Sequence, residues 1–267
     1  MSRRKLLIAA LALAALSLAA ASAAAQSRTR DRSHDSDDAD FTERDSSRES
    51  YALAPGASVE INSVSGGVTV ETSESSQAEV EIVRAARTRE DLECRKFKIE
   101  SGADRLLIDG SDRREQCRNV QVRQTVTMRL PRRVNFKANS VAGNVNVGAL
   151  DGAVSLTSVA GRATVAQASG EATFSSIAGN VVVNLSRLGG GGVHMNSIAG
   201  NIEIGLPAGA NANFTVNSIT GEVFADTPDV TVNKIGHSSY EGRAGAGGTE
   251  MIFNSIAGNV RFRRAGE

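Results

Sequence analysis

Residues 139–183 read NSVAGNVNVGALDGAVSLTSVAGRATVAQASGEATFSSIAGNVVV, and this stretch decides the fold because it repeats itself. A nine-residue motif, polar-Ser-(Val/Ile)-Ala-Gly-x-apolar-x-Val, occupies residues 139–147, 157–165 and 175–183. Successive copies begin 18 residues apart. Self-similarity at a fixed period is the sequence signature of architectures in which each unit packs on the next.

Further copies lie on both sides of this stretch. They read NSVSGGVTV at 62–70, NSIAGNIEI at 196–204, NSITGEVFA at 217–225 and NSIAGNVRF at 254–262. From Ser140 onward the serines are separated by 18, 18, 21, 21 and 37 residues. We attribute the steps of 21 to three extra residues at one turn, and the step of 37 to a hidden degenerate copy at 232–236 (VNKIG).

A half-period is also visible, because glycines recur every nine residues at 143, 152, 161, 170 and 179. Each repeat therefore consists of two strands and two turns, which favours two rows of strands. A step of 18 also suits a three-sided left-handed helix built from hexapeptides, so the number of faces stays open at this point.

The segments between the turns alternate apolar and polar residues, as strands with one buried face do. A unit of 18–21 residues cannot close a core of its own, whereas stacked units share one. We therefore predict an all-β protein whose repeats form a β-solenoid, similar to a parallel β-helix, with equivalent strands ~4.8 Å apart.

Stacking of this kind predicts ladders of equivalent residues. The interior apolar ladder is Val141, Val159, Ile177, Ile198, Ile219 and Ile256, and the turn ladder is Gly143, Gly161, Gly179, Gly200, Gly221 and Gly258. Glycine suits a sharp turn that needs positive φ, because it has no Cβ. The third ladder is Ser140, Ser158, Ser176, Ser197, Ser218 and Ser255, and a fourth is Asn139, Asn196, Asn217 and Asn254.

The serine ladder has a functional interpretation as a row of nucleophiles and a structural one as turn residues. A catalytic serine occurs once and has a histidine to activate it. Serine and asparagine beside a turn bond to nearby backbone groups. We therefore predict structural roles for both ladders.

The beginning of the chain has the pattern of a secretory signal. A basic start (Arg3, Arg4, Lys5) precedes an Ala/Leu-rich run, and Ala23-Ala24-Ala25 has the form of a cleavage site, which predicts a signal peptide at residues 1–25. The alternative is an uncleaved membrane anchor. Residues 26–50 are almost purely polar and charged, so we expect a disordered linker.

The two cysteines, Cys94 and Cys117, are predicted to form a disulfide because an exported chain meets an oxidising compartment. A metal or redox pair is the alternative, but the pair has neither CxxC spacing nor a nearby histidine. We assign residues 51–137 to an N-terminal β-strand region that contains this disulfide, and residues 138–267 to the solenoid repeats that continue it.

Charge and composition exclude some functions. Lys plus Arg and Asp plus Glu both total 30, and there is no Trp, so we expect no nucleic-acid partner. Residues 84–137 hold 15 basic and 8 acidic residues. They form either a basic face for an anionic envelope polymer or a solvated strand surface of mixed charge, and we favour the second.

No constellation for chemistry stands out. The acids of the repeat region occupy different phases of it: Asp151, Glu171, Glu203, Glu222, Asp226 and Asp229. His194 and His237 lack partners at the spacing of a metal site or catalytic triad. The glycine-rich segments lack the phosphate-loop signature. We predict no catalytic residue, no metal site and no cofactor.

The pattern resembles a bacterial putative-adhesin family of unknown function, most clearly in LPRRVNFKANSVAGNVNV (130–147) and GAGGTEMIFNSIAGNVRF (245–262). The resemblance covers residues 51–264, but not the insert between the cysteines. It implies a β-solenoid, a periplasmic or extracellular location and no established catalytic residues.

These observations favour an exported cell-envelope protein with a structural, adhesive or binding role. Its partner would be an envelope polymer or protein, with no stable membrane insertion after signal cleavage. Two other functions stay open: an enzyme acting on an acidic polysaccharide, and an accessory protein of an envelope-stress signalling system.

Overall fold

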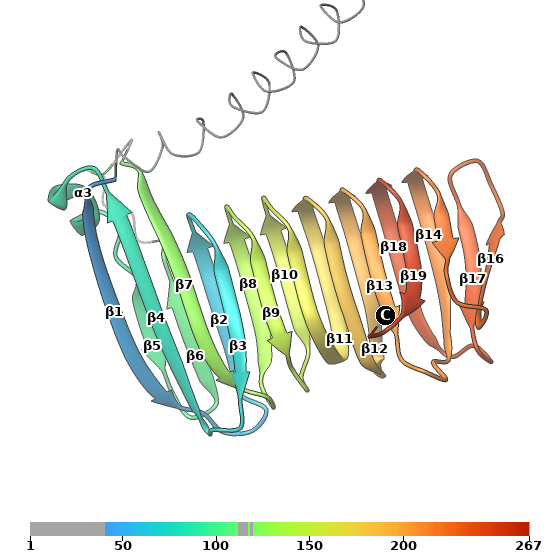
Figure 1. The fold of residues 1–267 in the computed structure, drawn as a ribbon, viewed down its shortest axis with the longest axis horizontal. Helices are drawn as coiled ribbons and strands as arrows, with labels where there is room; N and C mark the ends of the chain where they lie inside the picture. The colour runs from blue at the N-terminus through green and yellow to red at the C-terminus, as the bar shows by residue number, and fades with distance from the viewer. Residues whose placement is uncertain (1–40, 112–116, 118–119, 267) are drawn as a thin grey trace, which may run out of the picture.

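The chain is all-β in the computed structural model, which describes residues 41–111, 117 and 120–266. The strands join a 19-stranded sheet that wraps around one core, and a short helix, α3 (Arg89–Glu93), lies near one end (Figure 1). The strands are β1 (Glu43–Ala52), β2 (Ser58–Val64), β3 (Val68–Ser73), β4 (Gln77–Ala86), β5 (Lys98–Ser101), β6 (Arg105–Asp109), β7 (Val122–Pro131), β8 (Asn135–Val141), β9 (Val145–Ala149), β10 (Val154–Val159), β11 (Ala163–Ala178), β12 (Val181–Ala199), β13 (Ile202–Leu206), β14 (Ala212–Thr220), β15 (Val223–Ala225), β16 (Val230–Lys234), β17 (Tyr240–Ala244), β18 (Thr249–Ala257) and β19 (Val260–Arg264). The predicted signal peptide, residues 1–25, lies outside the described residues, as does the linker up to residue 40.

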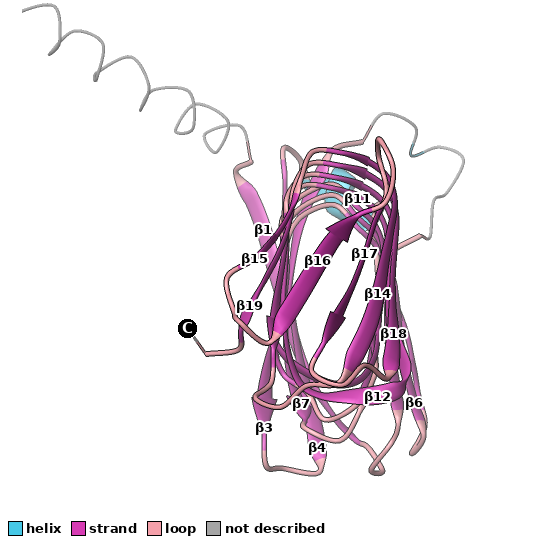
Figure 2. Ribbon diagram, turned by 90° about the vertical axis from the view of Figure 1, so that its right-hand side faces the viewer, coloured by secondary structure: helices cyan, strands magenta, loops and turns pink. Residues whose placement is uncertain are grey.

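The strands form two facing rows, seen from the side in Figure 1 and from the end in Figure 2. We name them after β8 and β9. The β8 row runs in space through β5, β6, β2, β8, β10, the second half of β11, the second half of β12, β18, β14, β17 and β16. The β9 row runs through β1, β4, β7, β3, β9, the first half of β11, the first half of β12, β13, β19 and β15.

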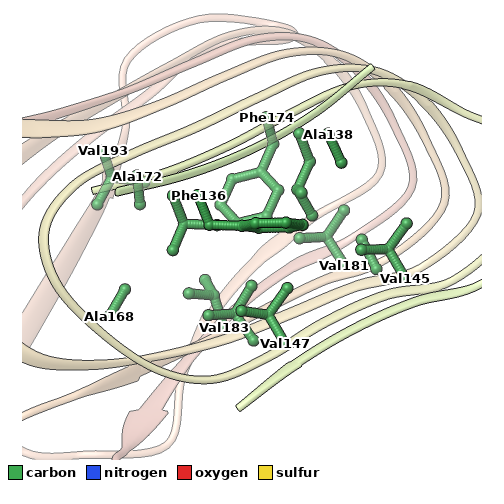
Figure 3. Close-up of a cluster of buried hydrophobic side chains, with 14 of the residues drawn as sticks. Phe136, Ala138, Val145, Val147, Ala168, Ala172, Phe174, Val181, Val183 and Val193 are labelled. Carbon is green, nitrogen blue, oxygen red and sulfur yellow. The ribbon is translucent and has the colours of Figure 1, made fainter. Parts of the chain in front are cut away.

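Equivalent residues of successive repeats pair in register. Val159 pairs with Val141 on one side and with Ile177 on the other, in parallel strands. Ile177 in turn pairs with Ile198. The six residues of the apolar ladder are at most 4% exposed. Figure 3 shows part of this core, where Phe136 and Phe174 of the β8 row face Val147 and Val183 of the β9 row.

The order of the strands in space departs from their order in the sequence near both ends. Ile198 pairs with Ile256, and Ile256 pairs with Ile219. The coil β18–β19 therefore lies between the coils β12–β13 and β14–β15, although it follows both in the chain. At the other end, β2 lies between β6 and β8, and β3 lies between β7 and β9.

The hidden copy that we predicted at residues 232–236 is absent, and this prediction is wrong. These residues belong to β16 and the turn after it, and β16 pairs with β17 in antiparallel orientation. The hairpin closes the end of the β8 row beyond β14. The long serine step therefore spans a hairpin, after which the chain returns to insert β18 and β19.

Strand β1 corrects the predicted boundary of the disordered linker, which extended to residue 50. It pairs with β4 from Glu43↔Ala86 to Ala52↔Gln77, so residues 43–50 are ordered. A polar sequence suffices here because β1 is an edge strand whose side chains are mostly exposed. Main-chain pairing and the bond from Arg84 to Asp45 replace the apolar burial that the sequence lacks.

The ladder serines have an unusual backbone. Their φ angles lie between 54° and 56°, and Ser63 in the equivalent position has 58°. This left-handed conformation shifts the alternation of the strand by one residue: Phe174 and Ile177 are both buried although they are three positions apart. The serine thus bends each strand while both apolar neighbours stay in the core.

The predicted positive φ is present at four of the six ladder glycines, Gly179, Gly200, Gly221 and Gly258, with values from 147° to 159°. The ladder glycines also serve a second purpose that the sequence did not predict. A Cβ added to Gly179 would lie 2.3 Å from the carbonyl oxygen of Gly161, and a Cβ on Gly161 would lie 2.4 Å from that of Gly143. Gly200, Gly258 and Gly221 continue the series at 2.3 Å. Glycine is required because neighbouring turns touch backbone to backbone.

Asparagines connect these turns. The side-chain oxygen of Asn144 accepts a hydrogen bond from the N–H of Arg162 at 2.9 Å, and that of Asn180 accepts one from Asn201 at 3.0 Å. Asn201 and Asn259 act in the same way one and two coils further on. In the predicted asparagine ladder, Asn139 bonds to Asn62 at 2.8 Å. Each bond satisfies a polar group that the stack would otherwise leave unpaired.

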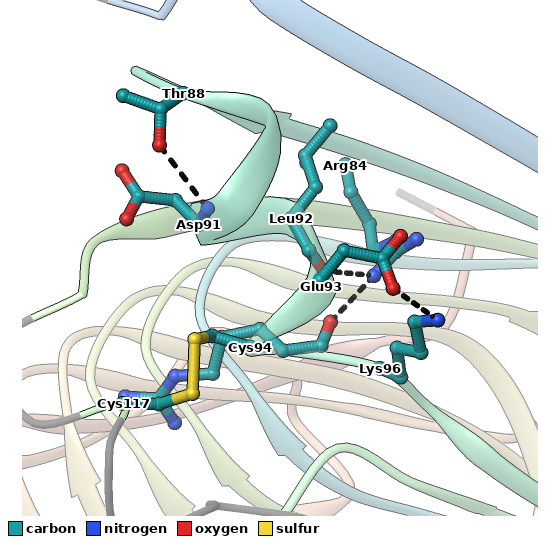
Figure 4. The surroundings of a disulfide bond; sticks show 9 residues. Arg84, Thr88, Asp91, Leu92, Glu93, Cys94, Lys96 and Cys117 are labelled. Atoms are coloured by element: carbon teal, nitrogen blue, oxygen red, sulfur yellow. Dashed lines mark hydrogen bonds and ion pairs between the residues drawn. A yellow bond between two sulfur atoms is a disulfide. The ribbon is translucent and has the colours of Figure 1, made fainter.

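The predicted disulfide between Cys94 and Cys117 is present, with Cα atoms 5.5 Å apart (Figure 4). It follows α3, which begins where Thr88 accepts a hydrogen bond from the N–H of Asp91 at 3.2 Å. The Arg84 side chain donates to the carbonyls of Leu92 at 2.7 Å and Arg95 at 2.8 Å. These two bonds from β4 hold α3 and the neighbouring Cys94 against that strand.

Candidate ligand-binding trough

The two edges of the stack differ. One edge carries the ladder serines and glycines, and we call it the serine edge. Its turns are short and uniform, and their backbones touch. The opposite edge carries connections of unequal length around residues 54–57, 131–134, 150–153 and 207–211, and also around 166–170 and 186–192, where the continuous strands β11 and β12 pass from one row to the other. We call it the loop edge, and its irregularity leaves space between neighbouring turns.

Three hollows follow one another along the loop edge. The central one has a volume of about 840 Å³ and shares Pro55, Arg133 and Asp151 with a neighbour of about 320 Å³. On its other side it shares Ser186 and Arg187 with a third hollow of about 460 Å³. Shared walls make the three hollows one open trough that runs along the stack.

The trough is built on a ladder of its own. Arg133, Asp151, Ser169 and Arg187 are 18 residues apart in sequence and all four line the central hollow. Strand pairing places Ser169 beside Arg187. The N–H of Asp151 bonds to the carbonyl of Arg132 at 2.8 Å, which fixes those two turns side by side.

The charges of the trough are partly balanced. Arg132 forms an ion pair with Asp151 at 3.6 Å, and about a third of each side chain is exposed. Arg133 and Arg187 are exposed, and no ion pair involves either within the described part of the chain. The central hollow therefore presents two uncompensated guanidinium groups.

The other polar groups of the central hollow are uncharged. Ser186 and Ser169 bond to each other through their hydroxyls, and Ser186 also reaches the carbonyl of Ala168 at 3.2 Å. The amide of Gln167 faces the same space. The residues that line the three hollows include no aromatic side chain. Hydrogen bonding and charge, rather than ring stacking, are what this surface offers.

The residues considered for catalysis do not converge. The ladder serines lie on the serine edge, away from the trough. Among the acids, Asp226 pairs with Arg261 at 3.2 Å, Asp229 pairs with Arg264 at 3.3 Å, and Glu203 pairs with Arg263. Each is compensated separately, and so is Asp151 through Arg132.

The histidines are equally separate. A ring nitrogen of His194 lies 2.9 Å from the carbonyl of Gly191, and His237 is exposed in the loop after β16. Among residues 41–111, 117 and 120–266, no three His, Cys, Asp or Glu side chains gather where they could hold a metal ion. Within the same ranges, no helix is long and apolar enough to cross a bilayer.

The basic segment 84–137 does not form one face in its described part. Arg129 pairs with Glu71 at 3.3 Å on the outer surface of the β9 row, and Arg132 pairs with Asp151 on the loop edge. The guanidinium of Arg123 lies over the ring of Phe41 at 4.7 Å. Among the described arginines of this segment that line the trough, Arg132 is paired and Arg133 contributes an uncompensated charge.

In the sequence, Arg132 and Arg133 are distinguished only as members of the basic segment 84–137, and Arg187 is not distinguished at all. The signal that could have found Arg187 is its spacing, 54 residues or three periods of 18 after Arg133. The trough itself depends on the unequal lengths of the turns, which the repeat pattern does not encode.

No protein-family profile and no curated protein matches this chain. Solved structures do resemble it. A putative cell adhesion protein from Clostridium sporogenes has 13% identity, covers 83% of this chain and 100% of its own, and gives a TM-score of 0.41. A putative adhesin from Bacteroides fragilis has 12% identity, covers 82% and 97%, and gives 0.32. A putative adhesin from Parabacteroides merdae has 11% identity, covers 82% and 96%, and gives 0.29. These names agree with the family that the repeat motif resembles, but identities and TM-scores this low carry no argument about a ligand.

Proposed function

We propose that the chain is an exported cell-envelope protein whose β-solenoid binds an extended partner along its loop edge, without catalysis. The observation that carries this proposal is the open trough with the uncompensated Arg133 and Arg187. A trough that crosses several coils suits a partner that is itself extended, such as an envelope polymer.

The absence of catalysis is part of the proposal. It is supported by the separate pairing of the acids Asp151, Glu203, Asp226 and Asp229 with arginines. Glycoside hydrolysis needs two carboxyl groups held at a fixed short separation across the bond. Incubation of the protein with a panel of uronate polymers should release no new reducing ends, and release of products would contradict this part.

Export is supported by the sequence of residues 1–25 and by the disulfide between Cys94 and Cys117, a bond that persists in oxidising compartments. We propose that residues 1–25 are removed as a signal peptide and that residues 26–40 link the start of the chain to β1. Mass spectrometry of the protein recovered from the cell envelope should give a chain that begins at Gln26.

Blocking the trough tests the binding proposal. The mature protein is immobilised and exposed to purified envelope polysaccharides and peptidoglycan, and the retained material is quantified. In the variant Ser186→Trp a large side chain fills the trough, so we expect it to lose the retained polymer. The matched control Ala160→Trp places the same side chain on the exposed serine edge and should retain as much as the unchanged protein.

Two outcomes would contradict the proposal. If the unchanged protein retains no envelope component, the binding role is wrong. If Ser186→Trp and Ala160→Trp retain equal amounts, the partner binds elsewhere. Circular dichroism of both variants shows whether they keep the β-sheet spectrum, so that a loss of binding is not mistaken for a loss of fold.

A further inference from the structure

We infer that the partner in the trough is a linear polymer bearing carboxylate or phosphate groups, held by Arg133 and Arg187. This inference rests on the proposed function, because it names the chemical class of ligand for the same trough. Carboxylate and phosphate share the geometry that a guanidinium group recognises, which is two oxygens facing two parallel N–H donors.

The two arginines are available for such a ligand. Both are exposed, both line the central hollow, and neither has an ion-pair partner among the described residues. The one acid of the central hollow, Asp151, is already paired with Arg132, so it repels an incoming anion less than a bare carboxylate would. Glu74 lines the neighbouring hollow of about 320 Å³ and is one carboxylate against the two guanidinium groups of Arg133 and Arg187, so the charge that remains for a ligand to balance is positive.

The backbones that carry the two arginines are well fixed. The carbonyl of Arg133 accepts a hydrogen bond from Gly56 at 2.6 Å, and the next residue, Val134, is fully buried. Arg187 lies within β12, paired with Ser169 of β11. On the side of the protein, a ligand that binds here need order only two side chains, which limits that part of the entropic cost of binding.

The spacing of the arginines points to a polymer. Arg133 and Arg187 occupy the same phase of the repeat with Asp151 and Ser169 between them, so their backbones are three coil spacings apart, ~14 Å. A single sugar acid or a free phosphate can engage both only if the two side chains bend toward each other from backbones that far apart. An oligomer that bridges both gains from linked binding, because the second contact forms at a high effective concentration.

The chemistry of the trough walls excludes the common alternative, a neutral glycan held by ring stacking. No aromatic residue is among those that line the three hollows. What surrounds the arginines is Gln167, Ser169 and Ser186, whose amide and hydroxyl groups suit the hydroxyls of a sugar or glycerol backbone between the anionic groups. Binding should therefore depend on charge and weaken as salt is added.

The test measures binding of the mature protein to four probes by calorimetry. Polygalacturonate supplies carboxylates, poly(glycerol phosphate) supplies phosphates, dextran is the neutral polymer, and galacturonate is the monomer. The variants are Arg133→Gln, Arg187→Gln and the double variant. The control is Arg162→Gln, which removes a charge from the serine edge that is likewise exposed.

We expect one or both anionic polymers to bind, and dextran and the monomer to bind at least tenfold more weakly. Each single trough variant should weaken binding about tenfold, and the double variant more than either, because a charge-assisted hydrogen bond to each arginine is lost. Arg162→Gln should bind like the unchanged protein. A comparison of the two anionic polymers tells which of the two groups the protein prefers.

Three outcomes would overturn the inference. One is equal binding of dextran and the anionic polymers; a second is no loss of affinity in Arg133→Gln and Arg187→Gln; a third is an equal loss in Arg162→Gln. Suppose that the anionic probes do not bind, but that the unchanged protein still retains envelope material and Ser186→Trp does not. The ligand class is then wrong and the proposed function stands. If nothing is retained in either experiment, the proposed function fails as well.

Discussion

Serine in the left-handed region is the most unusual residue-scale feature of this protein. Seven serines have φ between 54° and 58°, a region that L-residues other than Asn and Asp rarely occupy. The conformation costs ~1–2 kcal/mol per residue. The stack compensates for it, because the bend lets Phe174 and Ile177, on either side of Ser176, both stay in the core.

Substitutions at Ser176 should separate backbone from side-chain effects. We expect Ser176→Val to lower the free energy of unfolding by about 2 kcal/mol or more, because a β-branched residue is strained at positive φ. Ser176→Gly should stay within about 1 kcal/mol of the unchanged protein, since relief of strain offsets the added entropy of the unfolded chain. Urea unfolding monitored by circular dichroism measures both.

The neighbouring residue provides the control. Ser175 is not among the residues with positive φ and points away from the core, so Ser175→Val should change the unfolding free energy by less than about 0.5 kcal/mol. If Ser176→Val and Ser175→Val cost the same, the left-handed backbone is not what makes serine necessary.

Glycine at the serine edge leads to a second prediction. A methyl group at Gly179 would lie 2.3 Å from the carbonyl oxygen of Gly161, whereas one at Gly190 on the loop edge meets no atom within 4 Å. Gly179→Ala should therefore destabilise the protein by about 1–3 kcal/mol or more, as overpacking does. Gly190→Ala should be nearly neutral, and the difference in thermal midpoint between the two variants measures the effect.

Among the elements, the antiparallel caps and the disulfide distinguish one end of the molecule from the other. The caps β1–β4–β7 and β5–β6 close one end, and α3 with the disulfide lies against β4. The hairpin β16–β17 closes the other end of the β8 row. The outermost strands β5 and β16 have only four and five residues, and the ten-residue edge strand β1 carries charged side chains; both features discourage further strand addition.

The disulfide predicts a stability that depends on redox conditions. Cys94 and Cys117 are 23 residues apart. Closing a loop of that length restricts the unfolded chain by about 3–4 kcal/mol in the entropic description. A reductant should therefore lower the thermal midpoint of the unchanged protein, whereas the double variant Cys94→Ser/Cys117→Ser should melt at one temperature with or without reductant. An unchanged midpoint on reduction would contradict the prediction.

The sequence predicted the elements of the repeat far better than the ends and the trough. A period of 18 identifies the residues that share a ladder, because equal positions in equal coils must lie together. It cannot tell the order of the coils when a hairpin interrupts the chain, as it does after β15. It also cannot distinguish a polar linker from a polar edge strand such as β1, since main-chain pairing holds that strand.

The trough was missed for a related reason. Its volume depends on how turns of unequal length lie against one another, and only the packed molecule defines that. Arg187 was visible in the sequence as the fourth member of a series with Arg133, but nothing in the residues indicated that the two face the same hollow. Charge compensation, such as that of Arg132 by Asp151, is likewise a property of the fold.

At the scale of the whole molecule, the coil β18–β19 contacts two neighbours instead of ending the stack. Deletion of residues 249–267 should therefore leave β14–β17 without a place to pack, and we expect loss of cooperative unfolding and association in size-exclusion chromatography. The control removes residues 1–52, which takes away the edge strand β1. That variant should stay folded and monodisperse, with a lower midpoint.

In ordinary repeat proteins the outermost unit contributes one interface, so its removal lowers the stability of the remaining units only slightly. If the protein without residues 249–267 unfolds as cooperatively as the full chain, the inserted position of β18–β19 is wrong.

The late insertion also has a consequence for how the molecule assembles as it is made or exported. The segments β12–β13 and β14–β17 are synthesised before β18–β19. The position between these two coils therefore stays unfilled until the end of the chain has been made. Ile198 and Ile219 both pair with Ile256, so neither has this neighbour until β18 has been synthesised. The coil β18–β19 therefore completes the contacts of both neighbouring coils in one step. A chain that still lacks this coil would remain incompletely packed.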